Sequence, residues 1–382
     1  MSQTKPDAGR AWMGPLDGVR VLELGGIGPG PFAAMLLADM GADVVRVDRP
    51  GEVPLFPGRP EQNLLHRNKR SVALNLRDDE GGRTARALAD EAHVVIEGFR
   101  PGTAERLGVG PQDLWETNPA LVYGRMTGWG QDGPRAMTAG HDINYVAVTG
   151  ALHAIGEAGG PPQIPVNLLG DFGGGGAYLV IGVLAALREA GETGRGQVVD
   201  AAIVDGVSHL LAGTHARIAS GTWVDERGVN LLDGGAPFYA VYETSDGQHM
   251  AAGAIENKFY TEMLSLLDLD DAPETQNDRS TWPGLRQRIA QRFASQTQAH
   301  WCQIFEKTDA CVSPVRSMHG ALEDPQIASR GSVFVAEQLQ PGRAPRFPSY
   351  ANTPIKAAPW PGANTDEVLA EWLTSPRTVT TN

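Results

Sequence analysis

The sequence predicts an α/β protein in which a large parallel-sheet domain precedes a small α+β domain. Short apolar runs alternate with helical segments through roughly the first half of the chain, a pattern typical of parallel sheets. From about residue 222 the pattern changes to a hairpin followed by short helices. At 382 residues the chain exceeds the size at which one core keeps growing, so two domains are expected.

The sheet begins with a strand, a glycine-rich turn, a helix and a second strand. Apolar runs at 19–24 and 43–48 predict the strands, and the helix starts near Pro31. The turn also fits the dinucleotide-binding pattern GxGxxA, with an acidic residue 20 positions after the first glycine for a ribose. The matching residues are Gly28, Gly30, Ala33 and Asp48.

Two details of this turn disfavour a nicotinamide cofactor. Pro29 and Pro31 remove amide donors that a pyrophosphate would use, and Arg49 directly follows the acidic Asp48. An arginine can accept the extra phosphate of NADP, so a nicotinamide oxidoreductase stays open as an alternative.

The alternation continues to about residue 207. The segment Asp78–Glu91 predicts a charged helix, and the Gly- and Pro-rich stretch 129–140 predicts a loop. A buried strand turning into a helix is expected at 196–207. Further strands are expected at 71–76, 93–98 and 120–128, and an apolar helix at 177–190.

The second domain is predicted from a hairpin in which Ser245, Asp246 and Gly247 join two strands. Helices are expected near 256–267, 284–294 and 297–307, before a short strand, CVSPV. We therefore divide the chain into a large domain (1–205), a linker helix (206–230), a small α+β domain (231–325), and a return segment and tail that pack on the large domain (326–382).

Charge and cysteine content limit the classes of function. A net charge of −13 disfavours a nucleic-acid or anionic-membrane partner. Cys302 and Cys311 have no clustered partners, so neither a zinc site nor a disulfide framework is expected. The N-terminus lacks the apolar core of a signal peptide, and the longest apolar run, 177–187, is too short to span a membrane. We expect a cytoplasmic protein.

Three motifs place an acid/base group beside glycine: GHDINY with His141, NLLGDFGGGG with Asp171, and AGAIENKFY with Glu256. Each has a structural alternative. His141 could be a hydrogen-bonded loop residue, Asp171 a helix cap, and Glu256 a favourable charge at a helix N-terminus.

The glycine run Gly173–Gly176 follows Asp171 at an expected helix start. There the glycines would expose backbone N–H groups to an anion or a developing oxyanion, which makes the backbone of Asp171 a candidate oxyanion donor. The alternative is that the glycines only permit close packing of helix on sheet.

Basic residues gather near the predicted carboxyl ends of strands in the first domain, where open α/β sheets bind ligands. Several phosphates would suit them, and the alternative is a solvated charged face. The set is Arg46, Arg49, Arg67, Lys69, Arg70, Arg100 and Arg106.

With these residues assembled, the chain resembles the family III CoA-transferase superfamily, and within it most resembles the alpha-methylacyl-CoA racemases. The resemblance covers roughly residues 15–335 and rests on motifs in a fixed order. They include HRNKRSVALNL, EGFRPGTAERLG, GHDINY, NLLGDFGGGG, GQVVDAAIVDG and GAIENKFY.

The resemblance implies a Rossmann-like large domain and a small domain in an interlocked homodimer. It also implies acyl-CoA substrates, no cofactor and no metal. By matching motifs, His141 and Asp171 correspond to the two acid/base groups and Glu256 to the carboxylate that partners the histidine. The CoA contacts correspond to Ile27, Arg49, Arg67, Arg100, Arg106 and Tyr145.

Inversion at the carbon beside a thioester needs a base on one face and an acid on the other. Neutral His141 would take the proton while protonated Asp171 returns one, and the roles exchange in the reverse direction. A racemase of 2-methylacyl-CoA is therefore the first interpretation. In a CoA-transferase, the closest alternative, Asp171 would attack the thioester and form a mixed anhydride. A non-enzymatic CoA-binding protein is a third class.

The stretch 208–221 does not identify the acyl group of the substrate. Racemases of long branched chains look methionine-rich there, whereas SHLLAGTHARIASG has no methionine and includes His215 and Arg217. A shorter, more polar or ring-bearing acyl group is consistent with this stretch.

Overall fold

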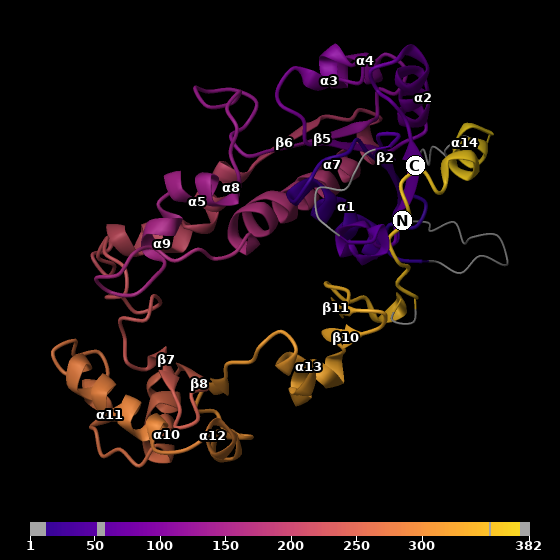
Figure 1. Cartoon of the computed structure of the whole chain (residues 1–382). Helices are drawn as coiled ribbons and strands as arrows, with labels where there is room; N and C mark the ends of the chain where they lie inside the picture. The colour runs from indigo at the N-terminus through magenta and orange to yellow at the C-terminus, as the bar shows by residue number, and fades with distance from the viewer. Residues whose placement is uncertain (1–12, 52–57, 351–352, 375–382) are drawn as a thin grey trace. The chain divides into compact units, whose positions relative to one another are not determined.

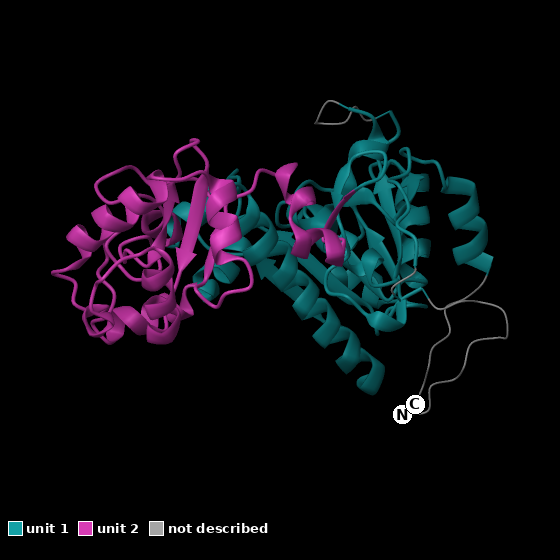
Figure 2. Ribbon diagram, turned by 90° about the horizontal axis from the view of Figure 1, so that it is seen from below, with its two compact units in different colours: residues 1–149, 166–210, 335–382 teal, residues 150–165, 211–334 magenta. Residues whose placement is uncertain are grey.

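The computed structural model describes residues 13–51, 58–350 and 353–374, and the chain divides into two compact units. Figure 2 distinguishes them: the first comprises 1–149, 166–210 and 335–382, and the second comprises 150–165 and 211–334.

This division differs from the boundaries expected from the sequence. Residues 150–165, expected in the large domain, belong to the second unit, because Arg227 ties them to it. Its guanidinium donates to the carbonyls of His153 and Gly160 at 2.9 and 2.8 Å. The return to the first unit comes at 335 rather than 326. The expected linker helix over 206–230 is also replaced by two helices, the second of which ends at Ala219.

The first unit is built on a six-stranded parallel sheet of order β3-β2-β1-β4-β5-β6. The strand order reverses between β1 and β4, and open α/β sheets bind their ligands at such a reversal. This confirms the predicted α/β fold with a Rossmann-like sheet. The strands are β1 (Arg20–Glu23), β2 (Asp43–Asp48), β3 (Arg70–Ala73), β4 (Val94–Glu97), β5 (Val122–Thr127) and β6 (Val198–Ala202).

Helices follow the strands in the predicted alternation (Figure 1). The N-cap of α2, Asp78, accepts the Gly81 N–H at 2.7 Å, and acidic residues in the first turn favour the positive end of the helix. Trp372 of α14 is fully buried in the core of this unit, so the return segment packs on it. The helices are α1 (Pro29–Asp39), α2 (Asp79–Asp90), α3 (Thr103–Arg106), α4 (Pro111–Trp115), α5 (Asp142–Val148), α7 (Ala177–Thr193), α8 (Ile203–Leu210) and α14 (Thr365–Thr374).

A π-helical segment, η3 (Leu168–Gly176), runs directly into α7. Together they form a helix of 26 residues, Leu168–Thr193, with a mean hydropathy of 1.5 in its most apolar window. The expectation that no apolar segment reaches membrane-spanning length was wrong, because the glycine run expected before the helix lies inside it. By length and composition this helix could cross a membrane, a test that core helices of soluble proteins also pass.

The second unit is centred on an antiparallel sheet of order β7-β8-β9. The predicted hairpin is confirmed, since the Thr244 N–H donates to the Gln248 carbonyl at 2.8 Å across its turn. Aromatic side chains, including the fully buried Phe238, Tyr260 and Phe293, fill the core of this unit. Its elements are α6 (Ala151–Ala154), α9 (Ala212–Ala219), β7 (Tyr239–Glu243), β8 (His249–Gly253), α10 (Asn257–Leu266), α11 (Trp282–Ala294), α12 (Gln298–Phe305), β9 (Val312–Pro314) and α13 (Pro325–Arg330).

A two-stranded sheet, β10 (Val333–Val335) with β11 (Leu339–Pro341), forms where the chain passes from the second unit back to the first.

Candidate active site

Asp171 lies on η3, half-buried, where the π-helical turn brings it close to two other elements of the first unit. Burial raises the pKa of its carboxyl group, and the charge of His141 lowers it. The Asn167 side-chain amide, one turn earlier, donates to the Asp171 carboxylate at 3.4 Å. Because π-helical turns are rare and concentrate at functional sites, this segment is a strong candidate for chemistry.

Asp142 connects Asp171 to His141. Its side chain is buried, and its carboxylate accepts the backbone N–H of Asp171 at 2.7 Å and that of Gly170. Asp142 is the first residue of α5, and His141 is the N-cap residue of that helix. The contact therefore fixes the start of α5 against η3, and with it the two predicted acid/base residues.

The packing around this contact leaves no room for larger residues at Gly170. A Cβ atom there would overlap the Asp142 carboxylate and lie 2.9 Å from Val146. Sequence reasoning assigned no function to Asp142 or Asn167. The available signals were their positions, directly after His141 and four residues before Asp171, and neither signal identifies a hydrogen-bond partner.

The glycine-rich turn after β1 packs against the Asp171 carboxylate. Gly28 has a left-handed φ of 67°, and a Cβ atom on it would lie 2.9 Å from Asp171 Oδ2. In a dinucleotide-binding protein this turn approaches a pyrophosphate, which a neighbouring carboxylate would repel. The acidic Asp48 is also occupied, because it accepts hydrogen bonds from Arg46 at 2.6 Å and from Ser71 at 2.5 Å. The nicotinamide alternative is therefore disfavoured.

The glycine run serves close packing, the alternative that the sequence left open. A Cβ atom on Gly176 would lie 2.7 Å from the Phe32 ring, and one on Gly174 would lie 2.7 Å from Val207. The absence of side chains lets η3 pack directly against α1 and α8. Because these glycines lie inside a continuous helix, they do not form a helix N-terminus that could receive an anion.

The prediction that the Asp171 backbone binds the oxyanion also needs correction. The Asp171 backbone N–H donates to Asp142, so in this structure it is not free to donate to a thioester oxygen.

Tyr145, expected to contact CoA, organises the loop that leads to His141. Its hydroxyl donates to the Gly140 carbonyl, and its ring meets that of Trp129 edge-on with centroids 4.8 Å apart. Side chains at Gly128 or Gly140 would collide with the Tyr145 ring. The structure thus shows a positioning contact for Tyr145, and its contact with CoA stays a prediction.

Glu256 is the exposed N-cap residue of α10 in the second unit. Because His141 belongs to the first unit, the pairing of these two residues stays a prediction.

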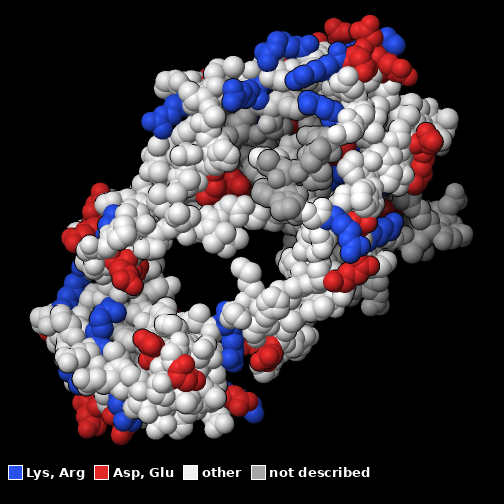
Figure 3. Space-filling model, viewed as in Figure 1, with Lys and Arg blue, Asp and Glu red and all other residues white. Residues whose placement is uncertain are grey.

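Four of the six residues expected to contact CoA are exposed on the first unit. Ile27 is 57% exposed, and Arg49, Arg100 and Arg106 have exposed side chains near the carboxyl ends of β1, β2 and β4. Figure 3 shows basic side chains gathered over the part of this unit that carries α3. These residues can receive an anionic ligand from solvent.

Arg67 was also predicted to contact CoA, and the structure contradicts that prediction. Its side chain is 2% exposed and forms a bidentate ion pair with Asp39, with Nη2 to Oδ2 at 2.5 Å. Its third nitrogen donates to the Pro341 carbonyl at 2.6 Å. The guanidinium therefore holds the return segment against α1 and does not face solvent.

The other basic residues near Arg67 are also paired. Lys69 binds Glu23 at 2.7 Å, and both side chains are fully buried. Arg46 binds Asp48 at 2.6 Å, and Arg70 binds Asp43 and Glu371. The predicted phosphate-binding cluster is thus reduced to Arg49, Arg100 and Arg106.

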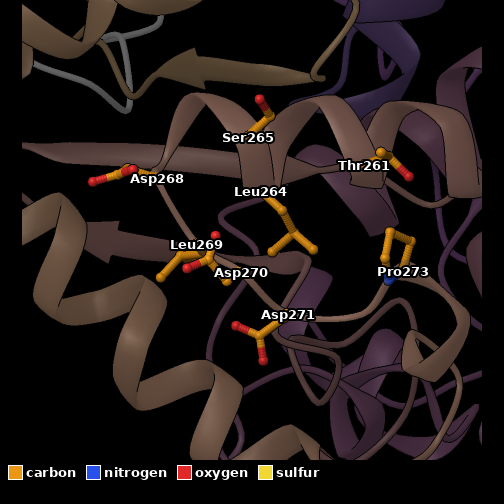
Figure 4. Close-up of a pocket in the computed structure, with 8 residues that line it drawn as sticks. All are labelled: Thr261, Leu264, Ser265, Asp268, Leu269, Asp270, Asp271 and Pro273. Atoms are coloured by element: carbon orange, nitrogen blue, oxygen red, sulfur yellow. The ribbon is translucent and has the colours of Figure 1, made fainter.

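A separate pocket of about 320 Å³ lies in the second unit beside α10 (Figure 4). Three of its eight lining residues are aspartates and none is basic, so the pocket offers CoA phosphates no cationic partner. Two of them are already paired, Asp271 with Arg288 and Asp268 with Arg292. Among the described residues, no group of His, Cys, Asp and Glu side chains could hold a metal ion.

Comparison with known proteins identifies the family of this chain. The model of CoA-transferase family III matches residues 16–367. The alpha-methylacyl-CoA racemases of Mus musculus and Homo sapiens are each 43% identical to it, over 94% of this chain and 93% of theirs. The Homo sapiens succinyl-CoA:glutarate CoA-transferase is 28% identical, over 94% of this chain and 86% of its own.

Solved structures agree with the fold. The crystal structure of a CAIB/BAIF family protein from Brucella suis aligns with a TM-score of 0.79 and 27% identity, covering 94% of this chain and 99% of that one. The chain therefore belongs to CoA-transferase family III.

Proposed function

We propose that this protein is an alpha-methylacyl-CoA racemase, which inverts the alpha carbon of 2-methylacyl-CoA thioesters. The observation that supports the proposal is the Asp142–Asp171 contact, because Asp142 directly follows His141 and the charge of His141 acts on the Asp171 carboxyl group. Identity favours racemization over CoA transfer, since it is 43% to the racemases and 28% to the human CoA-transferase.

The site residues perform the inversion as an acid/base pair. In one direction neutral His141 removes the alpha proton, and protonated Asp171 returns a proton to the opposite face of the enolate. In the other direction the Asp171 carboxylate removes the proton and the imidazolium returns it. Burial raises the pKa of Asp171, which favours the protonated form that the first direction requires. The motif of Glu256 supports its assignment as the carboxylate that orients the imidazole and favours its charged form.

The CoA moiety binds over the loops that follow the strands of the first unit. Arg49, Arg100 and Arg106 contact its phosphates, and Ile27 and Tyr145 contact its nucleotide or pantetheine. Support comes from the exposed position of the three arginines after β2 and β4, on the side of the sheet where open α/β proteins bind ligands. The reaction uses no cofactor or metal, and the protein works in the cytoplasm without nucleic-acid or membrane partners.

The working form is an interlocked homodimer. Large apolar side chains are exposed on and before the long helix, including Ile164, Val166, Leu168 and Ile181, each 62–63% exposed. A second copy of the chain would bury them.

Proton exchange tests this function directly. The wild-type protein, incubated with a 2-methylacyl-CoA in D₂O, should incorporate deuterium at the alpha carbon, as measured by mass spectrometry. His141→Ala and Asp171→Ala should each slow incorporation by at least about a hundredfold without unfolding the protein. Transfer of CoA to free carboxylic acids without exchange would replace the proposal with the transferase alternative, in which Asp171 forms an anhydride. CoA binding with neither reaction would indicate a binding protein.

A further inference from the structure

Arg125 on β5 contacts the end of strand β4 and the loop that follows β5. Its side chain is 11% exposed. On one side it pairs with Glu97, the last residue of β4, with Nε 3.8 Å from Oε1. On the other side Nη1 donates to the Gln131 side chain at 2.7 Å. Neither contact was predicted from the sequence, because local sequence patterns do not identify these hydrogen-bond and ion-pair partners.

Glu97 holds the loop 98–102, which carries Arg100. Its side chain is 3% exposed, and Oε2 accepts the Phe99 N–H at 2.6 Å. The loop closes with the Thr103 N–H donating to the Arg100 carbonyl at 3.0 Å. The Glu97 carboxylate therefore fixes the start of the loop that presents a proposed phosphate contact.

Gln131 holds the loop 128–140, which leads to His141. Its backbone N–H is hydrogen-bonded to Asp200 on β6, and its side chain is bound by Arg125. Near the two ends of this loop, Trp129 and Gly140 both contact Tyr145 of α5. A continuous series of contacts thus runs from Arg100 through Glu97, Arg125 and Gln131 to the segment that ends at His141.

The charges around Arg125 are not balanced. Three carboxyl groups surround the single guanidinium: Glu97 on β4, Glu105 on α3 and Asp200 on β6. The pKa of Glu97 is raised to about 7: burial is the largest cause and Glu105 and Asp200 add to it, while the Phe99 N–H and Arg125 act in the opposite direction. The strength of the Glu97 contacts therefore changes with pH near neutrality.

We propose that Arg125 is a positioning residue that couples CoA binding to proton transfer, with Glu97 anchoring the CoA-binding loop and Gln131 anchoring the loop before His141. This inference rests on the proposed racemase function. It goes beyond that function by assigning the coupling to three residues outside the proposed acid/base pair and the proposed CoA contacts.

Three variants separate the effect on CoA binding from the effect on proton transfer. Glu97→Gln should raise the KM for a 2-methylacyl-CoA about tenfold at pH 8 and leave kcat for exchange nearly unchanged, since it weakens one charge-assisted hydrogen bond. Gln131→Ala should lower kcat about tenfold and leave the Kd for CoA unchanged. Arg125→Met, combined with Glu97→Gln so that no buried carboxylate is left unpaired, should change both quantities.

A pH profile provides the measurement that a purely structural role would not alter. In the wild type, KM should fall as pH rises through about 7, because ionised Glu97 holds the Phe99 N–H and Arg125 more strongly. Glu97→Gln should remove this step. The matched control is Glu116→Gln, the same change on an exposed residue at the end of α4. It should keep the wild-type pH profile of KM, including any step that comes from ionisation of the substrate.

Superimposable KM profiles for the wild type, Glu97→Gln and Glu116→Gln would overturn the proposal, and so would equal effects of Glu97→Gln and Gln131→Ala on both KM and kcat. Titration calorimetry with CoA alone, repeated at pH 6 and pH 8, keeps this test independent of turnover. If the wild type showed no proton exchange, the proposed racemase function would be wrong. The pH dependence of the Kd for CoA would still test the role of Glu97.

Discussion

The carboxylate of Asp142 accepts the backbone N–H of Asp171 at 2.7 Å. The two residues are 29 positions apart, and the contact brings the start of α5 against η3. Because His141 precedes Asp142 directly, one hydrogen bond sets the position of both proposed acid/base groups.

Removing this acceptor should disable the site without removing a catalytic side chain. Asp142→Leu should slow alpha-proton exchange by about a hundredfold, because misplacement by about 1 Å can have an effect of that size. It should also lower the free energy of unfolding by about 1–3 kcal/mol, since two amides lose their acceptor. Asp142→Asn keeps an acceptor oxygen and should retain most of the activity. Equal exchange rates for the two variants would contradict the positioning role.

Gly28 should tolerate no side chain, because its φ is positive and because the Asp171 carboxylate lies next to it. Gly28→Ala places a Cβ atom 2.9 Å from Asp171 Oδ2 at a φ of 67°. Gly18→Ala is the matched control, since Gly18 has a φ of 86° and nothing within 4 Å of its Cβ position. Both variants should lose about 1–2 kcal/mol of stability in chemical denaturation. Only Gly28→Ala should slow exchange, and an equally slow Gly18→Ala would refute the proposed contact.

Arg67 and Arg100 should respond to alanine substitution in opposite ways. Arg67→Ala leaves the buried Asp39 without its ion-pair partner, with only the Asn68 amide still donating to it, and should lower the free energy of unfolding by about 3–5 kcal/mol, with the Kd for CoA unchanged in the folded protein. Arg100→Ala should weaken CoA binding in titration calorimetry and leave the melting temperature unchanged, because its side chain is exposed. A Kd raised by Arg67→Ala alone would reverse the assignment.

Glu97 should make the stability of the protein depend on pH. Its pKa is raised from 4.5 to about 7, so between these values the folded protein keeps a proton that the unfolded chain has released. Stability should therefore fall as pH rises from about 4.5 to about 7, by at most about 3 kcal/mol. Urea denaturation at several pH values should show this contribution vanish in Glu97→Gln and persist in Glu116→Gln. Parallel curves for the wild type and Glu97→Gln would contradict the raised pKa.

The sequence by itself determined the parallel sheet, the hairpin and the class of fold. Each strand of the parallel sheet lies within one of the predicted apolar runs or begins one residue before it, and the hairpin of the second unit forms around the predicted turn. These features follow from periodicity and turn residues over a few positions of the chain. The motif order also identified the family and marked His141, Asp171 and Glu256 as the acid/base candidates.

Only the tertiary structure decided which charged and polar groups pair. It placed Arg67 on Asp39, Asp142 on the Asp171 amide, and the glycine run inside a continuous helix rather than at a helix start. It also placed Arg125 between the end of β4 and the loop after β5. Such partners lie far apart along the chain or in separate elements, and ion pairs and buried hydrogen bonds depend on distance and burial in the folded state. Residue type and local pattern do not encode those two quantities.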